Sequence, residues 1–366
     1  MKKDKVLKIV KISIITMLSI MVVVCIAGYI IIHMYINKMN LIKDNSESEV
    51  TMNEVTGNIN TEEDIGETAI EGQQMDITNS PQEDIDNIEN VIRENTKENK
   101  QEISSNDVYN ILLIGCDSRE AGGSGRSDAM IIVSINSKTK KIILTSLLRD
   151  IYLKIPSHNN NRLNAAYAYG GAELLIDTIE ENFQIDIDKY ISIDFYTFID
   201  VVDFIGGVSL EVKEKYIPII NNYISEINRQ NGVKESNDHL TKTGNYVLNG
   251  KQTLGYVRNR YIGTDFERTA RQREVLQKIF DKIKDLNLIK IKKMSDQVLP
   301  QVTTNLSEKK IISLFMSLPT YKNYEIVQWS IPMEDTYSFL TINRMSVIGI
   351  NFNKNINNLH KKVYED

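Results

Sequence analysis

The sequence contains few residues of the kinds that form disulfides and zinc sites. Only two of its 366 residues are cysteine and four are histidine. Cys25 lies in an apolar N-terminal run and Cys116 in a predicted core strand, so we expect the two to be too far apart to form a disulfide. The histidines are scattered, and neither a Gly-x-Ser-x-Gly elbow nor a His-Glu-x-x-His helix occurs. Nucleophilic and zinc chemistry therefore have no support in the sequence.

An excess of positive charge is also lacking. The net charge is −6, whereas a nucleic-acid-binding domain is usually basic and carries exposed aromatic residues among its cations. Charge is instead distributed unevenly along the chain, with lysines near the N-terminus and acidic residues after them. This distribution argues against a nucleic-acid partner and is typical of a protein that crosses a membrane.

A charge-free run near the N-terminus predicts a membrane helix. No charged residue occurs from Ile12 to Ile32, and a helix of about 21 residues rises roughly 31 Å, enough to cross a bilayer. The lysines that precede this run, which should remain in the cytoplasm, are Lys2, Lys3, Lys5, Lys8 and Lys11. We therefore predict a cytoplasmic tail over residues 1–11, a single-pass transmembrane helix over residues 12–36, and an extracellular remainder at the cell membrane.

A cleaved signal peptide and a lipoprotein signal are the alternatives to this membrane helix. A signal peptide would have a shorter apolar region and small residues at a cleavage site, which residues 34–36 (Met-Tyr-Ile) do not provide. A lipoprotein would have a small residue before the acylated cysteine, but Val24 precedes Cys25. Both alternatives fit the sequence less well than an uncleaved anchor.

Residues 37–107 have the composition of an acidic flexible linker. They are rich in Glu, Asp, Asn, Ser and Thr, so they cannot bury enough apolar surface to offset the entropy lost on ordering. A coil of about 70 residues would span roughly 45 Å. The one candidate for local structure is a short helix near residues 85–98, and we expect the segment to be a passive tether.

Periodic structure begins at Val108, so residues 108–366 are predicted to form one large extracellular domain. Apolar runs predict strands at residues 109–114, 129–135, 141–147, 190–193, 209–212 and 325–331. Helical spacing predicts helices at residues 171–183, 195–205, 266–283 and 307–318. This alternation predicts an α/β fold, with an α/β/α sandwich around a mixed central sheet. Residues 214–243 fit the scheme poorly and are interpreted as an insertion.

Polar clusters lie at the ends of three predicted strands, where α/β proteins tend to bind ligands. Asp117 follows the first strand, Asp128 begins the second after the glycine-rich segment 122–128, and Arg149 and Asp150 follow the third. Glycine-rich backbone can approach a phosphate closely, and two aspartates can hold one hard cation whose shell substrate oxygens complete. The alternatives are a turn residue at Asp117, a flexible hairpin at 122–128 and a surface ion pair at Arg149.

Arginine is most concentrated in residues 256–273. Arg268 and Gln272 share one helix face, and Arg271 lies beside Arg268. This helix is predicted to start near Asp265, so its positive N-terminal end adds to the field of the guanidinium groups. Such crowding is unfavourable unless an anion relieves it, and guanidinium groups match phosphate oxygens well. A solvated basic face and a nucleic-acid-binding stripe are the alternatives.

Together and in this order, these clusters resemble the LytR-CpsA-Psr family of cell-wall glycopolymer transferases. The resemblance covers roughly residues 108–284. Its motifs are Asp117-Ser118-Arg119, Arg126-Ser127-Asp128-Ala129-Met130, Arg149-Asp150, Leu163-Asn164-Ala165-Ala166-Tyr167-Ala168-Tyr169-Gly170-Gly171, Phe204-Ile205-Gly206-Gly207-Val208, Tyr256-Val257-Arg258-Asn259-Arg260 and Asp265-Phe266-Glu267-Arg268-Thr269-Ala270-Arg271-Gln272. The chain departs from the family at residues 147–151, where the usual Ile-Pro-Arg-Asp-Thr is Leu-Leu-Arg-Asp-Ile, and its linker is long for the family.

The resemblance implies an α/β/α catalytic domain with an apolar groove for a polyprenyl chain. It implies a phosphotransferase that attaches a glycopolymer, such as teichoic acid or capsule, from a polyprenyl-pyrophosphate carrier to peptidoglycan in cell wall assembly. Mg²⁺ is the implied cofactor, with Mn²⁺ as the alternative, and its implied ligands are Asp117 and Asp128. The implied substrate-binding residues are Arg119, Arg126, Arg149, Arg258, Arg260, Arg268, Arg271 and Gln272. The implied catalytic residues are Arg258, Arg260, Asp265 and Arg268.

Two other functions are compatible with the same residues. A polyprenyl-pyrophosphate pyrophosphatase would use this site with water as the acceptor. A membrane-bound transcriptional attenuator is the other alternative, because the family was once described in those terms. The predicted topology argues against direct DNA contact, since the folded domain would lie outside the cell.

Overall fold

The computed structural model describes residues 40–41, 78–97, 103–117, 127–259, 262–286, 290, 293–294 and 297–365. The predicted cytoplasmic tail and transmembrane helix, residues 1–36, lie outside this part of the chain. No helix within the described part is long and apolar enough to cross a membrane.

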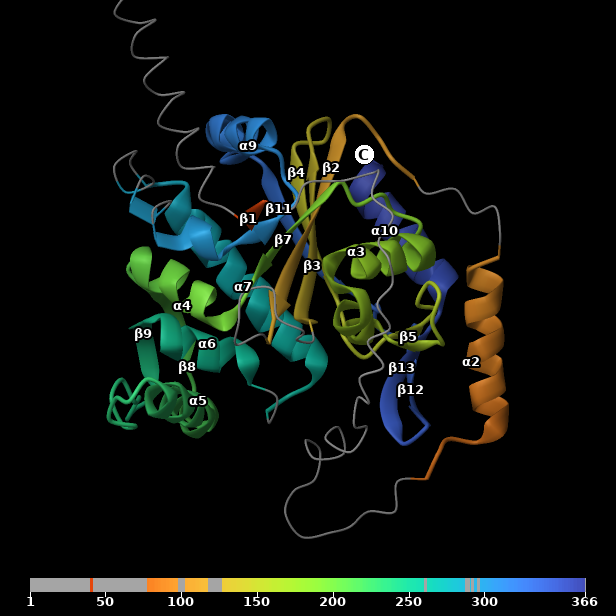
Figure 1. The fold of residues 1–366 in the computed structure, drawn as a ribbon, viewed down its shortest axis with the longest axis horizontal. Helices are drawn as coiled ribbons and strands as arrows, with labels where there is room; N and C mark the ends of the chain where they lie inside the picture. The colour runs from red at the N-terminus through yellow and green to blue at the C-terminus, as the bar shows by residue number, and fades with distance from the viewer. Residues whose placement is uncertain are drawn as a thin grey trace, which may run out of the picture.

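A seven-stranded mixed sheet forms the centre of the fold, in the order β1-β10-β7-β2-β3-β4-β11 (Figure 1). Its strands are β1 (Asn40–Leu41), β2 (Val108–Cys116), β3 (Ser127–Asn136), β4 (Lys141–Leu147), β7 (Lys189–Ile193), β10 (Thr303–Thr304) and β11 (Glu325–Ile331). Strands β2, β3 and β4 are antiparallel neighbours, while β7 runs parallel to β2 and β11 runs parallel to β4. The predicted α/β fold around a mixed central sheet is confirmed, and β4 and β11 have the predicted bounds.

The larger hydrophobic core lies on one face of this sheet. It is covered by helices α3 (Leu163–Phe183) and α10 (Phe352–Tyr364) and by the hairpin of β12 (Tyr337–Ile342) and β13 (Met345–Ile350) (Figure 1). The short strands β5 (Tyr152–Leu153) and β6 (Asn161–Arg162) connect β4 to α3. On this face the central strands are completely covered, since Leu112, Ile132 and Ile143 have no exposed surface.

Helix α3 extends the predicted helix at residues 171–183 toward the N-terminus. It begins at Leu163 and has a kink at Gly170 and Gly171, where Gly171 adopts a φ of 67°. Because only glycine adopts this conformation readily, the glycine pair allows the helix to change direction. The kink explains why the sequence pattern predicted a helix only after Gly171.

Helices α7 (Asp265–Ile283) and α9 (Glu308–Tyr321) lie on the opposite face of the sheet (Figure 1). A second core packs against α7. It comprises α4 (Phe195–Phe204), β8 (Val208–Val212), a 3₁₀ helix (Glu214–Tyr216), α5 (Ile217–Gln230), β9 (Gly244–Leu248) and α6 (Gly250–Arg258). Residues 214–243 therefore belong to this core, because Ile220 and Ile224 of α5 are fully buried in it. A further 3₁₀ helix, Leu299–Gln301, precedes β10.

Part of the predicted flexible linker belongs to the folded region. Helix α2 (Gln82–Asn95) lies beside β12 and α10, and its Ile88 and Ile92 are buried in the larger core (Figure 1). Asn95 donates a hydrogen bond of 2.8 Å to the carbonyl of Asn182 at the end of α3. The prediction of a linker over residues 37–107 is therefore wrong for α2, because Ile85 and Val91 also pack against the larger core beside the two buried isoleucines.

Candidate active site

Two aspartates lie at adjacent strand ends. Asp117 follows β2, and Asp128 is the second residue of β3. Gly115 pairs with Ala129 and Cys116 pairs with Ser127, so Asp128 is the extra residue of a β-bulge. A bulge changes the direction of the side chain that it carries. The carboxylate of Asp128 accepts a hydrogen bond of 3.1 Å from Nη1 of Arg149.

The segment after β4 contributes a partly buried ion-pair network. Nε of Arg149 lies 3.4 Å from Oδ2 of Asp150, and Nη1 of Arg162 lies 3.4 Å from Oδ1 of the same carboxylate. The backbone holds this segment against the start of α3, because the amide of Asn164 donates to the carbonyl of Arg149 at 3.1 Å. Asp150 therefore fixes two guanidinium groups at the edge of the sheet.

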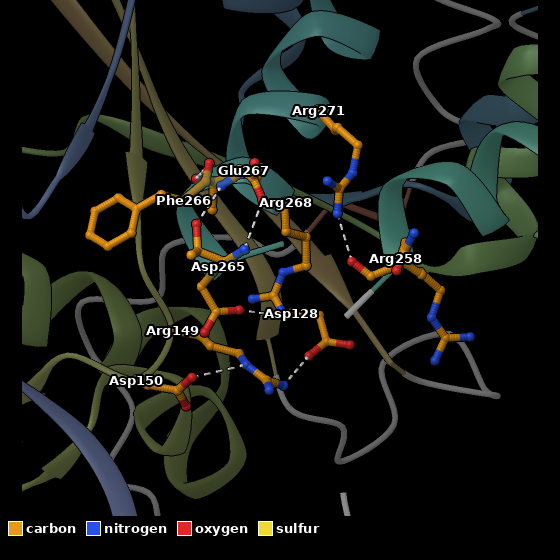
Figure 2. Close-up of polar contacts among 12 residues, drawn as sticks. Asp128, Arg149, Asp150, Arg258, Asp265, Phe266, Glu267, Arg268 and Arg271 are labelled. Atoms are coloured by element: carbon orange, nitrogen blue, oxygen red, sulfur yellow. Dashed lines mark hydrogen bonds and ion pairs between the residues drawn. The ribbon is translucent and has the colours of Figure 1, made fainter. Parts of the chain in front are cut away.

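The N-terminus of α7 faces this network. Thr264 caps the helix, with its hydroxyl accepting from the amide of Glu267, as expected for a helix that starts at Asp265. The ring of Phe266 packs on Tyr337 of β12 with centroids 4.9 Å apart, which fixes the first turn of the helix. Asp265 then pairs with Arg268 at 3.0 Å. Figure 2 shows Asp265 and Arg268 directed toward Arg149 and Asp128, while Phe266 points away.

The charged groups after β4 and at the start of α7 shift the pKa values of Arg149 and Asp150. Burial lowers the pKa of the Arg149 guanidinium, but the carboxylates of Asp150, Asp128 and Asp265 together raise it above its ordinary value. Burial raises the pKa of Asp150, and the charge of Asp265 raises it further, against the opposing effects of Arg149, Arg162 and Arg268. The strand-end network and the first turn of α7 therefore form one electrostatic unit.

Arg258, the last residue of α6, approaches from the second core. Its guanidinium carbon lies 4.0 Å from the centroid of the Phe195 ring and 4.8 Å from that of Tyr223, so two aromatic faces hold it. Its Nη2 lies 3.8 Å from Oδ2 of Asp117. Arg258 is thus fixed by aromatic rings and directed at the end of β2.

Asp117 and Asp128 fit a hard divalent cation better than zinc. They supply carboxylate oxygens, which Mg²⁺ prefers, and they come from adjacent strand ends. Within the described residues, no group of three or more His, Cys, Asp and Glu side chains could hold a metal. A cation held by two carboxylates would take its remaining ligands from other oxygen donors, such as substrate and water.

A model of the LytR_cpsA_psr family matches residues 75–361, which is more than half of the chain. The chain belongs to this family. This LytR-CpsA-Psr chain is 34% identical over 227 residues to the polyisoprenyl-teichoic acid–peptidoglycan teichoic acid transferase TagT of Bacillus subtilis strain 168, over 61% of this chain and 67% of TagT. The resemblance inferred from the sequence motifs is confirmed, and the match begins before α2, in agreement with the packing of that helix.

Solved structures of TagT resemble the fold described above. TagT bound to LIIa-WTA is 29% identical, with a TM-score of 0.57, and the match covers 73% of this chain and 96% of that one. TagT with bound octaprenyl pyrophosphate lipid is 27% identical, with a TM-score of 0.53, over 73% of this chain and 95% of that one.

Most of the predicted site residues that the structure describes lie close to one another in this LytR-CpsA-Psr chain. Asp128, Arg149, Asp265 and Arg268 are joined by ion pairs and by the charge of Asp265 acting on Arg149. Arg258 and Asp117 form a separate pair at the adjacent strand end, and Figure 2 shows Arg258 in one view with the first four. Arg119, Arg126 and Arg260 lie outside the described residues. Gln272 is partly buried, one turn after Arg268 on α7.

Arg271 differs from the other predicted substrate-binding residues. It is buried, its Nη2 donates to the carbonyl of Asn259 at 2.7 Å, and its guanidinium lies over the Tyr216 ring at 5.5 Å. Figure 2 shows it on the side of α7 that faces α6. These contacts fix the end of α6, so in the structure Arg271 helps to position Arg258.

Three residues that shape the site lie outside the motifs recognised in the sequence. Arg162 pairs with Asp150, and Phe195 and Tyr223 hold Arg258. Arg162 directly precedes the family motif that begins at Leu163, which is a signal that could have identified it. Phe195 and Tyr223 have the apolar spacing of core helices, so their contact with Arg258 could only be found in three dimensions.

Proposed function

We propose that this protein is a phosphotransferase that moves a glycopolymer from a polyprenyl-pyrophosphate carrier to peptidoglycan. The observation that carries this proposal is the convergence of Arg149, Arg258 and Arg268 with Asp117 and Asp128 at one edge of the sheet. A pyrophosphate has enough negative charge and acceptor oxygens to satisfy such a set of guanidinium groups. The transferase function and the bound lipid of TagT support the same conclusion.

An incompletely covered apolar sheet face supports a lipid-linked substrate. On the face turned toward α7 and α9, Leu113, Val133 and Ile191 of three adjacent strands are only partly buried. Ile131, Ile142 and Leu144 on the same face are buried, so only part of this face is incompletely covered. Apolar side chains at the centre of a sheet are normally covered, so this incomplete coverage favours an apolar groove that receives the polyprenyl chain.

The proposed reaction exchanges one bond to phosphorus for another. The acceptor hydroxyl oxygen forms a bond to the glycan-linked phosphorus, and the bond from that phosphorus to the bridging oxygen breaks, releasing polyprenyl phosphate. The arginines stabilise the charge that builds up on the phosphate oxygens. Asp265 is the better placed proton acceptor, because its side chain is 35% exposed whereas that of Asp128 is 14% exposed; each of the two pairs with one arginine.

Asp117 and Asp128 would hold Mg²⁺, or Mn²⁺ in its place, in this proposal. The bound cation would neutralise part of the charge of the pyrophosphate. Arg258 and Arg149 each pair with one of these carboxylates, so the two arginines also orient the proposed metal ligands. The catalytic domain would lie outside the cell, held at the membrane by the predicted helix at residues 12–36.

The test is transfer of a polyprenyl-pyrophosphate-linked glycan to isolated peptidoglycan by the full-length protein. Arg258→Ala is expected to lower the rate about 10²- to 10³-fold, because a donor to the transition state is lost. Arg229→Ala is the matched control, since Arg229 is exposed and pairs only with Glu235. Chelation of divalent cations is expected to stop transfer, and added Mg²⁺ to restore it.

Three results would contradict the proposal. Full transfer activity of the Arg258→Ala protein would remove the role of the guanidinium cluster. Release of phosphate without attachment of glycan would identify a pyrophosphatase instead. Specific DNA binding by the purified protein at physiological salt would favour the regulatory alternative.

A further inference from the structure

Arg273 of α7 is a buried cation that neither the motifs nor the proposed reaction uses. Its side chain is only 7% exposed, and its Nε and Nη1 have no hydrogen-bond partner among the described residues. Burial alone lowers the pKa of this guanidinium to about 10, with no opposing charge from a nearby carboxylate. A buried arginine without an acceptor destabilises the protein, so its presence requires an explanation.

The side chain of Arg273 lies on the face of α7 that covers the sheet. Leu276 and Gln277 follow one helical turn later and share this face. Leu276 packs against the cluster that contains Leu144, and Gln277 accepts a hydrogen bond from Gln328 of β11. Arg273 therefore lies on the sheet-facing side of α7, where the partly covered apolar surface is found.

The register of β4 and β11 shows which strand residues lie opposite Arg273. Helix α7 runs opposite to β4 and β11, because its first residue, Asp265, is close to Arg149 beyond the end of β4. Arg273 lies one helical turn before Gln277, a distance of about 6 Å along α7. The same distance along β11 is about two residues, so Arg273 lies at the level of Ser330, two residues after Gln328. Ser330 pairs with Ser146 of β4.

Ser146 provides a second unsatisfied group at this level. It lies on the same face of β4 as Leu144, the face that packs against α7. Its hydroxyl is buried and has no hydrogen-bond partner within the described part of the chain. The Ser146 hydroxyl and two guanidinium nitrogens of Arg273 thus have no hydrogen-bond partner among the described residues. They lie on facing elements, between the ion-pair network at Arg149 and the apolar residues Leu276 and Phe280.

We propose that Arg273 and Ser146 bind the lipid-linked phosphate of the polyprenyl carrier, as a second anion subsite on the lipid side of Arg268. This inference rests on the proposed function. The polyprenyl chain would occupy the apolar end of the sheet face, so the phosphate attached to it would lie between that end and Arg268. The subsite would hold polyprenyl phosphate as the leaving group and as the released product.

The test compares binding of geranylgeranyl phosphate and geranylgeraniol, by calorimetry, to the full-length protein in detergent. In Arg273→Met, the affinity for geranylgeranyl phosphate is expected to fall about 10- to 100-fold, as for loss of a charged hydrogen bond. Affinity for geranylgeraniol, which has no phosphate, is expected to change little. The melting temperature is expected to stay the same or rise, because an unpaired buried charge is removed. Arg229→Met is the control, and Arg273→Gln repeats the test with a polar side chain.

The outcomes separate this inference from the proposed function. Unchanged binding of geranylgeranyl phosphate by both Arg273 variants would overturn the inference while leaving the proposed function intact. A lower melting temperature with loss of both ligands would also overturn it, because Arg273 would then have a structural role. A folded wild-type protein that binds neither ligand would contradict the proposed function itself.

Discussion

Asp150 shows how a single residue can organise the candidate site. Its carboxylate contacts both Arg149 and Arg162, and it is influenced by the charges of Asp265 and Arg268. Burial raises the pKa of this carboxyl group, and the charges of Arg149 and Arg162 oppose that rise. The position of Arg149, a proposed substrate-binding residue, therefore depends on a carboxylate that the proposed reaction does not use.

The substitution Arg149→Met should reveal this dependence in the free energy of unfolding. Without Arg149, the pKa of Asp150 should rise further above its unfolded-state value, because its main favourable charge is lost. A raised folded-state pKa stabilises the protein below the unfolded-state pKa, and this contribution is lost as the pH rises through the folded-state pKa. We expect a loss of about 2–3 kcal/mol at pH 7.5 and a smaller loss at pH 4.

Chemical denaturation at the two pH values measures this effect. Arg229→Met should leave the stability unchanged at both, because Arg229 is exposed. An equal loss at pH 4 and pH 7.5 for Arg149→Met would show that the ion pairs of Asp150 are not its cause.

At the scale of elements, the junction between α4 and β8 shows how the second core is closed. Gly206 and Gly207 end α4 with φ angles of 76° and 79°. The ammonium group of Lys282, near the end of α7, donates to the carbonyl of Gly207 at 2.6 Å. The end of α4 is thus tied to α7, the helix that carries Arg268.

The two glycines should differ in their tolerance of alanine. A Cβ at Gly206 would meet nothing within 4 Å, whereas a Cβ at Gly207 would lie 2.6 Å from the carbonyl oxygen of Leu248. Gly206→Ala should cost about 1–2 kcal/mol for the left-handed conformation alone. Gly207→Ala should cost about 2–5 kcal/mol, because steric overlap is added. Denaturant unfolding of both variants checks this, and equal losses would mean that Leu248 moves away without cost.

The hairpin β12–β13 was not predicted, and helix α2 was predicted only as a candidate short helix near residues 85–98, because both have weak local signals. The hairpin β12–β13 turns at Asn343 and Arg344, which both have positive φ, but the sequence lacks the glycine that usually marks such a turn. Helix α2 lies in an acidic, polar stretch, and its position depends on contacts of Ile88 and Ile92 with distant elements. Strands β2, β3, β4 and β11 were predicted because apolar runs are a local signal.

At the scale of the whole molecule, the structure describes the folded domain, whereas the membrane anchor is known only as a prediction from the sequence. The described residues form a sheet with a core on each face, and the proposed site lies where the two cores meet at the ends of β2 and β4. The anchor at residues 12–36 is a prediction from hydropathy and lysine placement alone. The two parts together predict an enzyme that acts on a membrane-bound carrier from outside the cell.

Cell fractionation tests this topology. The full-length protein should remain with washed membranes, and protease added to the outer face of protoplasts should release a soluble fragment. A variant that lacks residues 1–36 should be soluble. Full-length protein free in the culture medium would contradict the prediction.

The sequence by itself determined the family, the main strands of the sheet and the residue types of the site. These features could be recognised because they depend on apolar runs and on short motifs, which are local along the chain. Only the tertiary structure decided that α2 belongs to the domain, that Asp150 joins Arg149 to Arg162, and that Arg258 lies against Phe195 and Tyr223. These contacts join segments that are distant in the sequence, and their energies depend on burial, which exists only after the chain has folded.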